Sequence, residues 1–201
     1  MIKKTFLFSL LLGLSFVATG CAVKQKVALE YQTETTAAAA QAYPKVNVVV
    51  NDERPYIKDG EKPASYIGTY RGGFGNPFNV NTKDHVALST LVLGDLEKDL
   101  SALGFIGENG DKTLVVDIMK WKFDAYQNAT FDYLLNVQVL DSTKNVLAKN
   151  DVVGDKIFIK GSFWTGGKGG VERDMPQLYS NIIKNIVREN SDVLTALKAG
   201  R

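Results

Sequence analysis

Alternation of apolar and polar residues predicts the strands of this chain. The clearest case is the segment 130–140, in which every second residue is apolar and the residues between them are mostly polar. The apolar set is Phe131, Tyr133, Leu135, Val137 and Val139. This pattern is typical of an antiparallel strand with one covered face. The segments 113–123 and 146–159 predict strands on either side of it, the second with a break, so we expect a three-stranded meander.

A valine-rich run predicts a further strand ahead of the meander. Residues 45–51 hold four valines, and such a β-branched run is typical of a well-buried strand. Residues 27–31 also alternate and indicate a short strand near the start of the chain. Between 55 and 81 the chain is rich in glycine and aromatic residues and is too long for an ordinary connection, although its piece 65–70 is a candidate strand.

Helical spacing of apolar residues predicts two long helices. The first covers 83–103 and ends at Gly104. Its apolar stripe is Leu88, Leu91, Val92, Leu96, Leu100 and Leu103. The second helix is expected from Gly170 or Val171 to Asn190, and Ser191 and Asp192 are expected to cap a short last helix.

The order of these elements predicts an α+β fold. Two amphipathic helices need an apolar sheet face to cover. We therefore expect a two-layer sandwich, a mainly antiparallel sheet of about four strands covered on one face by two long helices.

The first residues have the pattern of a secretory signal. Lys3 and Lys4 precede an apolar run at 6–17, which is twelve residues long. A membrane-spanning helix needs about 20 apolar residues, so this run is too short to be a permanent anchor. Small residues then lead to Cys21, the only cysteine in the sequence, which excludes an internal disulfide.

The motif Ala18-Thr19-Gly20-Cys21 resembles the lipobox of bacterial lipoproteins. In that family the cysteine thiol takes a diacylglyceryl group, cleavage falls before the cysteine, and the new amine is acylated. The resemblance implies a signal peptide at 1–20, a lipidated Cys21 with a tether over 21–43, and a periplasmic domain at 44–201. Ala22 stands where an inner-membrane retention signal would place Asp, so the resemblance implies the periplasmic face of the outer membrane.

Charge and composition narrow the function. Without the leader, which holds two lysines and no acid, the chain has 24 − 2 = 22 basic and 22 acidic residues. Nucleic-acid binding normally requires an excess of basic residues, and a net charge of zero shows no such excess. With one histidine, His85, and one cysteine, the sequence predicts no metal site, no cofactor and no nucleophilic triad, so we expect a protein that is not an enzyme. His85 is expected to be a solvated residue at a helix start.

Two glycine-rich motifs and one pair of charged residues give only weak indications of function. Gly72-Gly73-Phe74-Gly75 lacks the spacing of a dinucleotide loop, and Gly166-Gly167-Lys168-Gly169 lacks the Ser or Thr of a phosphate-binding loop. Asp52 and Arg54 are two residues apart at a strand end, so they share a face. We interpret them as a surface or edge ion pair, with recognition of a polar partner as the alternative.

Several of these features together resemble the YajG family of bacterial lipoproteins. They are the lipobox, the valine-rich strand ending in Asp52-x-Arg54, the helix ending in Leu103-Gly104-Phe105, the meander, and the C-terminal helix leading to Ser191-Asp192. The resemblance runs over 1–201 and implies a fold and a membrane location. The family is uncharacterised, so the resemblance transfers no active site.

The two glycine-rich loops hold the candidate binding residues. These are Tyr70, Phe74, Phe78, Phe163 and Trp164. Aromatic residues concentrate where binding energy does. They could line a surface for a partner or pack under their own loops, and we favour the packing interpretation.

The main functional hypothesis is a non-enzymatic outer-membrane lipoprotein that binds another envelope component, protein or peptidoglycan. The alternative is a carrier of a small ligand or lipid in an apolar groove between sheet and helices. A third hypothesis, an enzyme acting on cell-wall glycans, would need two converging carboxylates. The sequence gives no indication of the oligomeric state.

Overall fold

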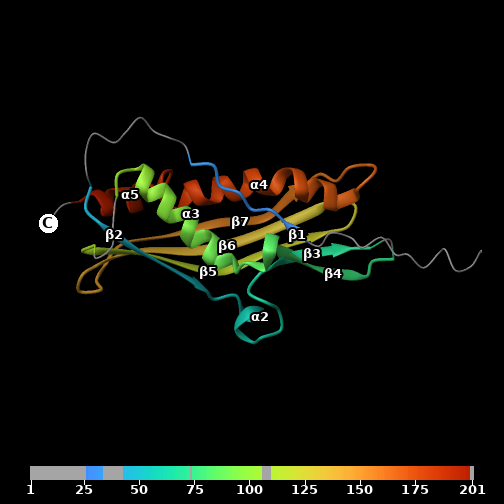
Figure 1. The fold of residues 1–201 in the computed structure, drawn as a ribbon, viewed down its shortest axis with the longest axis horizontal. Coiled ribbons are helices and arrows are strands. Elements are labelled where there is room, and N and C mark those ends of the chain that lie inside the picture. Colours follow the sequence, from blue (N-terminus) through green and yellow to red (C-terminus); the bar gives the residue numbers. More distant parts are fainter. Residues whose placement is uncertain (1–25, 34–42, 73, 106–109, 200–201) are drawn as a thin grey trace, which may run out of the picture.

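The computed structural model describes residues 26–33, 43–72, 74–105 and 110–199. In this part of the chain a curved sheet is covered by the helices α3, α4 and α5 (Figure 1). The elements are β1 (Lys26–Val27), β2 (Val46–Asp52), α2 (Pro55–Lys58), β3 (Tyr66–Arg71), β4 (Pro77–Thr82), the 3-10 turn η1 (Lys83–His85), α3 (Leu88–Ala102), β5 (Lys112–Ala125), β6 (Ala129–Asp141), β7 (Val146–Ile159), α4 (Gly166–Val187) and α5 (Ser191–Lys198).

The predicted sandwich of about four mainly antiparallel strands under two long helices is wrong. The described residues form one mixed sheet of seven strands, in the order β1-β4-β3-β5-β6-β7, with β2 also paired to β5. The meander β5-β6-β7 is confirmed as antiparallel. Of the additional short strands, β3 matches the candidate strand at 65–70 and β1 lies at the start of the predicted strand at 27–31. β4 was not predicted, because six residues leave too few alternating positions to be recognised in a sequence.

The first long helix is also shorter than predicted. Residues 83–85 form a 3-10 turn in which Asp84 and His85 have positive φ angles of 58° and 57°. A helix cannot run through two left-handed residues, so α3 begins at Leu88. At the other end of the chain α4 begins earlier than predicted, because the glycine-rich run from Gly166 is helical.

One edge of β5 is shared by two strands that lie end to end. β2 pairs in parallel with Lys112–Ile118, and β3 pairs in parallel with Phe123–Ala125. Between them the chain leaves the sheet at 53–65, forms α2 and returns in the same direction (Figure 1). β2 and β3 therefore act as one strand with a loop inserted in its middle.

The covered face of the sheet carries the core. The alternating residues of β6 are buried as predicted, with Phe131 and Leu135 fully inaccessible. The ring of Trp121 on β5 contacts Phe131 and Tyr179 of α4, with centroid distances of 5.2 and 6.0 Å. Apolar residues of α3 and α4 complete this single cluster, which packs between the sheet and the helices.

The first described segment, residues 26–33, packs against the sheet and α3. β1 pairs with β4, and Val27 and Leu29 are buried in the core cluster. The hydroxyl of Tyr31 donates a hydrogen bond to the carboxylate of Asp99 on α3. Residues 26–33, which the sequence placed within the tether, are therefore held against the sheet and α3.

Candidate functional site

The five candidate binding residues differ widely in their exposure to solvent. Tyr70 is 3 % exposed and packs in the core, with its ring centroid 5.5 Å from that of Phe123. Phe78 is 36 % exposed. Phe74, Phe163 and Trp164 are 99, 92 and 89 % exposed. These last three residues, which we call the aromatic end, are the candidate site.

The aromatic end lies where three connections meet. The strand pairs Tyr70–Ala125, Ala125–Ala129 and Ala129–Ile159 place the ends of β3, β5 and β7 and the start of β6 side by side. The β3–β4 hairpin, the β5–β6 turn and the β7–α4 loop therefore project from the same end of the sheet, on the right in Figure 1. Phe74 is on the hairpin, and Phe163 and Trp164 are on the β7–α4 loop.

Backbone hydrogen bonds hold the β7–α4 loop on the β5–β6 turn. The Gly167 N–H donates to the Tyr126 carbonyl over 2.7 Å, and the Gly161 N–H donates to Oδ1 of Asn128 over 2.9 Å. A side chain at Gly161 would place its Cβ 1.7 Å from the Gln127 carbonyl oxygen, so only glycine fits there. The loop presents the Phe163 and Trp164 rings edge to face, with centroids 5.0 Å apart.

The β3–β4 hairpin is held in a similar way. The Gly72 N–H donates to the Asn76 carbonyl over 2.9 Å, and the Gly75 N–H donates to the Gly72 carbonyl over 2.8 Å. Beside the tip, Arg71 makes a bidentate ion pair with Asp124 of β5, at 2.7 and 2.5 Å. Hydrogen bonding from Arg71 lowers the pKa of Asp124, which is only partly buried. Phe74 is thus carried on a closed turn.

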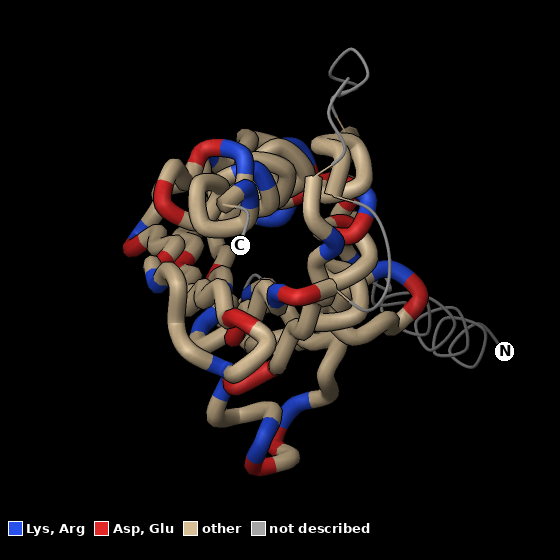
Figure 2. The backbone as a smooth tube through the Cα atoms, turned by 90° about the vertical axis from the view of Figure 1, so that its left-hand side faces the viewer, with Lys and Arg blue, Asp and Glu red and all other residues tan. Residues whose placement is uncertain are grey.

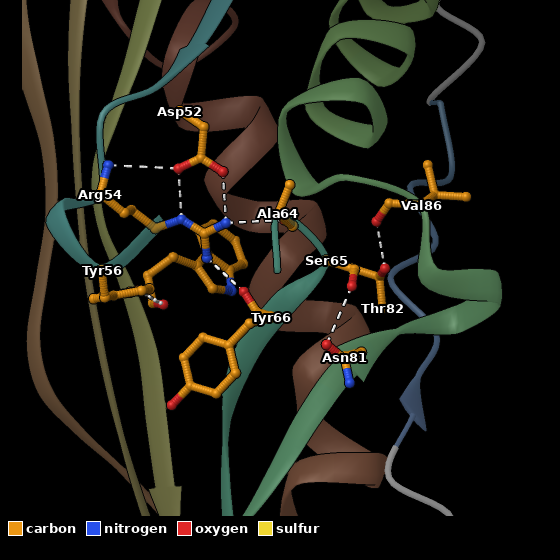
Figure 3. A network of polar contacts seen from close by, with 10 residues as sticks. Asp52, Arg54, Tyr56, Ala64, Ser65, Tyr66, Asn81, Thr82 and Val86 are labelled. Carbon is orange, nitrogen blue, oxygen red and sulfur yellow. Dashed lines mark hydrogen bonds and ion pairs between the residues drawn. The ribbon is translucent and has the colours of Figure 1, made fainter. Parts of the chain in front are cut away.

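Arg54 ties β3 to the end of β2 (Figure 3). Its guanidinium makes a bidentate pair with Asp52, with Nε–Oδ1 at 2.7 Å and Nη2–Oδ2 at 2.6 Å. It also donates to the carbonyls of Tyr66 and Ala64, at 2.5 and 3.1 Å. The predicted ion pair at the end of the strand is therefore present, but the Arg54 side chain is fully buried and not at the surface. The pair positions the loop insertion and the start of the strand that leads to Phe74.

A second polar network, missed by the sequence analysis, lies on α3. Asp95 and Asp99, one turn apart, are buried. The Tyr179 hydroxyl donates to Asp95 over 2.8 Å, and Nε of Arg188 donates to Asp99 over 2.6 Å. Burial, followed by the nearby carboxylates, raises the pKa of both Tyr31 and Tyr179, so these phenols stay protonated as donors. In the sequence, the only indication of this network is that two aspartates lie four residues apart beside the leucine stripe. Many exposed pairs of acidic residues on helices have the same spacing, so the spacing alone does not predict burial.

No three His, Cys, Asp or Glu side chains within the described residues lie close enough together to hold a metal ion. His85 is exposed. Cys21 and the predicted signal peptide at 1–20 lie outside the described residues, as does Gly73. Within the described ranges, no helix has the length and apolar character needed to cross a membrane.

Two shallow hollows lie beside β7. One of about 220 Å³ is lined by Tyr133, residues 150–153 and the end of α4, and another of about 250 Å³ by residues 157–159 and the first half of α4. Both are below the usual size of a small-molecule site, about 300–1,000 Å³. Both lie at the margin of the sheet, between the edge strand β7 and α4 or the residues just after it.

The comparisons with known proteins bear on the fold. No family model matches this sequence, and no curated protein matches it. A solved structure of a DUF330-family protein from Xanthomonas campestris is similar, with a TM-score of 0.53 and 12 % identity over 79 % of this chain and 92 % of that chain. A second structure, of an uncharacterised protein, has a TM-score of 0.45 and 15 % identity, covering 80 % of this chain and 100 % of that chain. The chain therefore shares its fold with proteins of an uncharacterised bacterial family.

Proposed function

We propose that this protein is a non-enzymatic lipoprotein of the bacterial envelope that binds another envelope component through its aromatic end. A lipid on Cys21 holds it at the periplasmic face of the outer membrane. The motif Ala18-Thr19-Gly20-Cys21 and the resemblance to the YajG family support the anchor. The fold shared with a bacterial protein of uncharacterised family is compatible with this assignment.

The exposure of Phe74, Phe163 and Trp164 is the observation that carries the binding proposal. Three large rings stand in solvent on loops that backbone hydrogen bonds and glycine contacts hold in place. Exposed apolar rings contribute little to the stability of the fold. Clustered exposed apolar side chains mark interaction sites in proteins that are otherwise well packed. Phe and Trp are also the residue types that carry binding energy at interfaces.

The carrier alternative receives no support from the described residues. A carrier needs an apolar cavity between sheet and helices, and that space is occupied by the core cluster around Trp121 and Tyr179. The hollows beside β7 are open and small.

Anchoring and binding are tested separately in cells that express the full chain. Labelled palmitate should be incorporated into the wild type and not into a Cys21→Ala variant. For binding, a photoreactive amino acid replaces Phe163 in one variant and Val146 in another. Val146 is a matched control because it is 55 % exposed and begins β7, next to the β6–β7 turn at the opposite end of the sheet (Figure 1).

The proposal expects crosslinked adducts of an envelope component, whether lipid, glycan or protein, from position 163 and none from position 146. Equal yields from both positions, or no adduct from position 163, would remove the aromatic end as a binding surface. Absence of palmitate label from the wild type would remove the anchor.

A further inference from the structure

The direction of β1 shows which end of the sheet faces the predicted anchor. β1 is parallel to β4, with Lys26 opposite Asn81, and β4 begins at Pro77 beside the hairpin tip. β1 therefore runs away from the aromatic end, and its first residue, Lys26, is the one nearer to that end. Cys21 is five residues before Lys26.

The distance between Cys21 and Lys26 is limited by the length of the chain that joins them. Five residues of fully extended chain span at most about 18 Å. From Asn81 back to Pro77 is four residues of strand, or about 14 Å. Cys21 can thus reach the level of the hairpin tip, but not the opposite end of β5. Asn81 lies near the level of Trp121, and Lys112 at the start of β5 is nine residues further along, or about 31 Å away. Buried Val27 and Leu29 prevent this segment from serving as extra tether.

We propose that the aromatic end lies in the phospholipid surface that holds the lipid of Cys21, with Phe74, Phe163 and Trp164 at the level of the headgroups. This inference rests on the proposed anchor and names the component that the aromatic end binds. The opposite end of the sheet, with the β6–β7 turn and α5, faces the periplasm.

The chemistry of the three side chains fits a membrane interface. Tryptophan is enriched at the headgroup level of bilayers because its ring is amphipathic, and apolar phenylalanine rings add buried area there. Stable attachment takes two signals, and aromatic contacts on two loops would add a second signal to the acyl chains and also fix the orientation of the domain.

Charge plays little part in this contact. Arg71 and Lys168 near the aromatic end are paired with Asp124 and Glu172. Figure 2, a view from the opposite end, shows basic and acidic residues interspersed along the chain without a single-sign region. The chain without its leader has no net charge. The contact should therefore require neither anionic lipid nor low salt.

Trp164 is a built-in probe for the test. The protein has two tryptophans, and Trp121 is fully buried while Trp164 is exposed. The lipidated wild type and its Trp164→Phe variant are reconstituted into phosphatidylcholine vesicles, with and without phosphatidylglycerol. The difference between their fluorescence spectra reports Trp164. In vesicles, its emission should shift to the blue, resist aqueous acrylamide, and be quenched by lipids brominated on the acyl chains.

A second measurement removes the anchor and isolates the loops. The Cys21→Ala chain without residues 1–20 should bind phosphatidylcholine vesicles weakly, and Phe74→Ser, Phe163→Ser and Trp164→Ser together should reduce this partitioning at least roughly tenfold, because burial of even one aromatic ring contributes about a factor of ten. The matched control is Val146→Ser with Leu147→Ser, two exposed apolar residues at the opposite end. The control should leave partitioning unchanged, as should a rise in salt.

Three outcomes would overturn the inference. If the wild type floats with vesicles but Trp164 stays open to acrylamide, the anchor stands and the lipid contact fails. If Trp164 is shielded only when purified peptidoglycan or an envelope protein is added, the binding function stands with a different component. If the wild type does not float with vesicles, the anchor itself fails, and the inference that rests on it falls too.

Discussion

Arg54 donates two hydrogen bonds to the carboxylate of Asp52, two residues before it, and this ion pair is largely shielded from solvent at the junction of β2 and β3. The Arg54 guanidinium also satisfies the carbonyls of Ala64 and Tyr66, where the inserted loop returns to the sheet. One side chain therefore connects the end of one strand, the loop and the start of the next strand.

Loss of Arg54 should be among the most destabilising single substitutions in this protein. Arg54→Ala leaves the Asp52 carboxylate and two carbonyls without their partner in a buried site, and breaking a buried pair costs about 3–5 kcal/mol of unfolding free energy. Urea unfolding followed by circular dichroism measures this loss.

The pair Arg71–Asp124 is a matched control. It has the same bidentate geometry, but its side chains are 42 and 34 % exposed. Solvent screens such a pair, so Arg71→Ala should cost only about 0–1 kcal/mol. Equal losses for Arg54→Ala and Arg71→Ala would contradict the account of the buried junction.

Two buried tyrosines should respond in opposite ways to removal of the hydroxyl. The Tyr179 hydroxyl donates to the buried Asp95, whereas the Tyr70 hydroxyl is buried and has no hydrogen-bond partner among the described residues. Tyr179→Phe leaves a buried carboxylate short of a donor and should cost about 1–3 kcal/mol. Tyr70→Phe removes an unsatisfied polar group and should leave the stability equal or higher.

Thermal unfolding of the wild type, Tyr179→Phe and Tyr70→Phe compares the two positions directly. A lower melting temperature for Tyr70→Phe than for the wild type would show that its hydroxyl has a partner, such as a buried water.

The β6–β7 turn should make stability depend on acid pH. Asp141 accepts hydrogen bonds from the side chains of Asn145 and Thr143 and from the N–H groups of both. These bonds, led by that of the Asn145 side chain, lower the pKa of Asp141 to about 2. Because the folded-state pKa lies below the unfolded value of about 3.9, the stabilisation is present above that value and is lost as the pH falls towards 2.

Asp141→Asn measures this contribution, because the amide does not titrate. The difference in urea midpoint between wild type and Asp141→Asn should be constant above pH 5 and should shrink as the pH falls from about 4 to about 2. A difference that is independent of pH across this window would exclude the depressed pKa.

Substitution by alanine should have opposite effects on stability at two glycines. Gly94 lies inside α3, and a Cβ added there would have no neighbouring atom within 4 Å, so Gly94→Ala should stabilise the protein by about 0.5–1 kcal/mol through helix propensity. At Gly161 the added Cβ would collide with the Gln127 carbonyl oxygen. Gly161→Ala should therefore destabilise the protein and displace the loop of Phe163 and Trp164.

Urea unfolding measures both stabilities, and acrylamide quenching of Trp164 reports the loop. If Gly161→Ala left the stability and the quenching unchanged, the loop would not be held on the β5–β6 turn as described.

Much of the secondary structure could be read from the sequence, because it depends on local periodicity. The meander from β5 to β7, the valine-rich β2 and the apolar stripe of α3 each extend over enough residues for a repeat to show. Between 66 and 82 the first strand, β3, matches the candidate strand at 65–70, whereas the six-residue β4 was not separable from a long glycine-rich loop.

The sequence named candidate aromatic residues but could not separate the exposed ones from the buried one. Tyr70 and Phe74 look alike in the sequence, being aromatic residues among glycines, yet one is buried against Phe123 and the other stands in solvent. Strand register decides this, because Tyr70 is the last residue whose side chain can turn to the covered face before the hairpin tip.

By itself the sequence determined the lipobox-like leader with its single cysteine, the zero net charge of the rest, and the main strands and helices, because each of these is a property of neighbouring residues. Only the tertiary structure decided that β2 and β3 share one edge of β5, that Arg54 is buried between them, and that Phe74, Phe163 and Trp164 stand exposed at one end of the sheet. These relationships join residues that are far apart in the chain, and long-range packing alone brings them together.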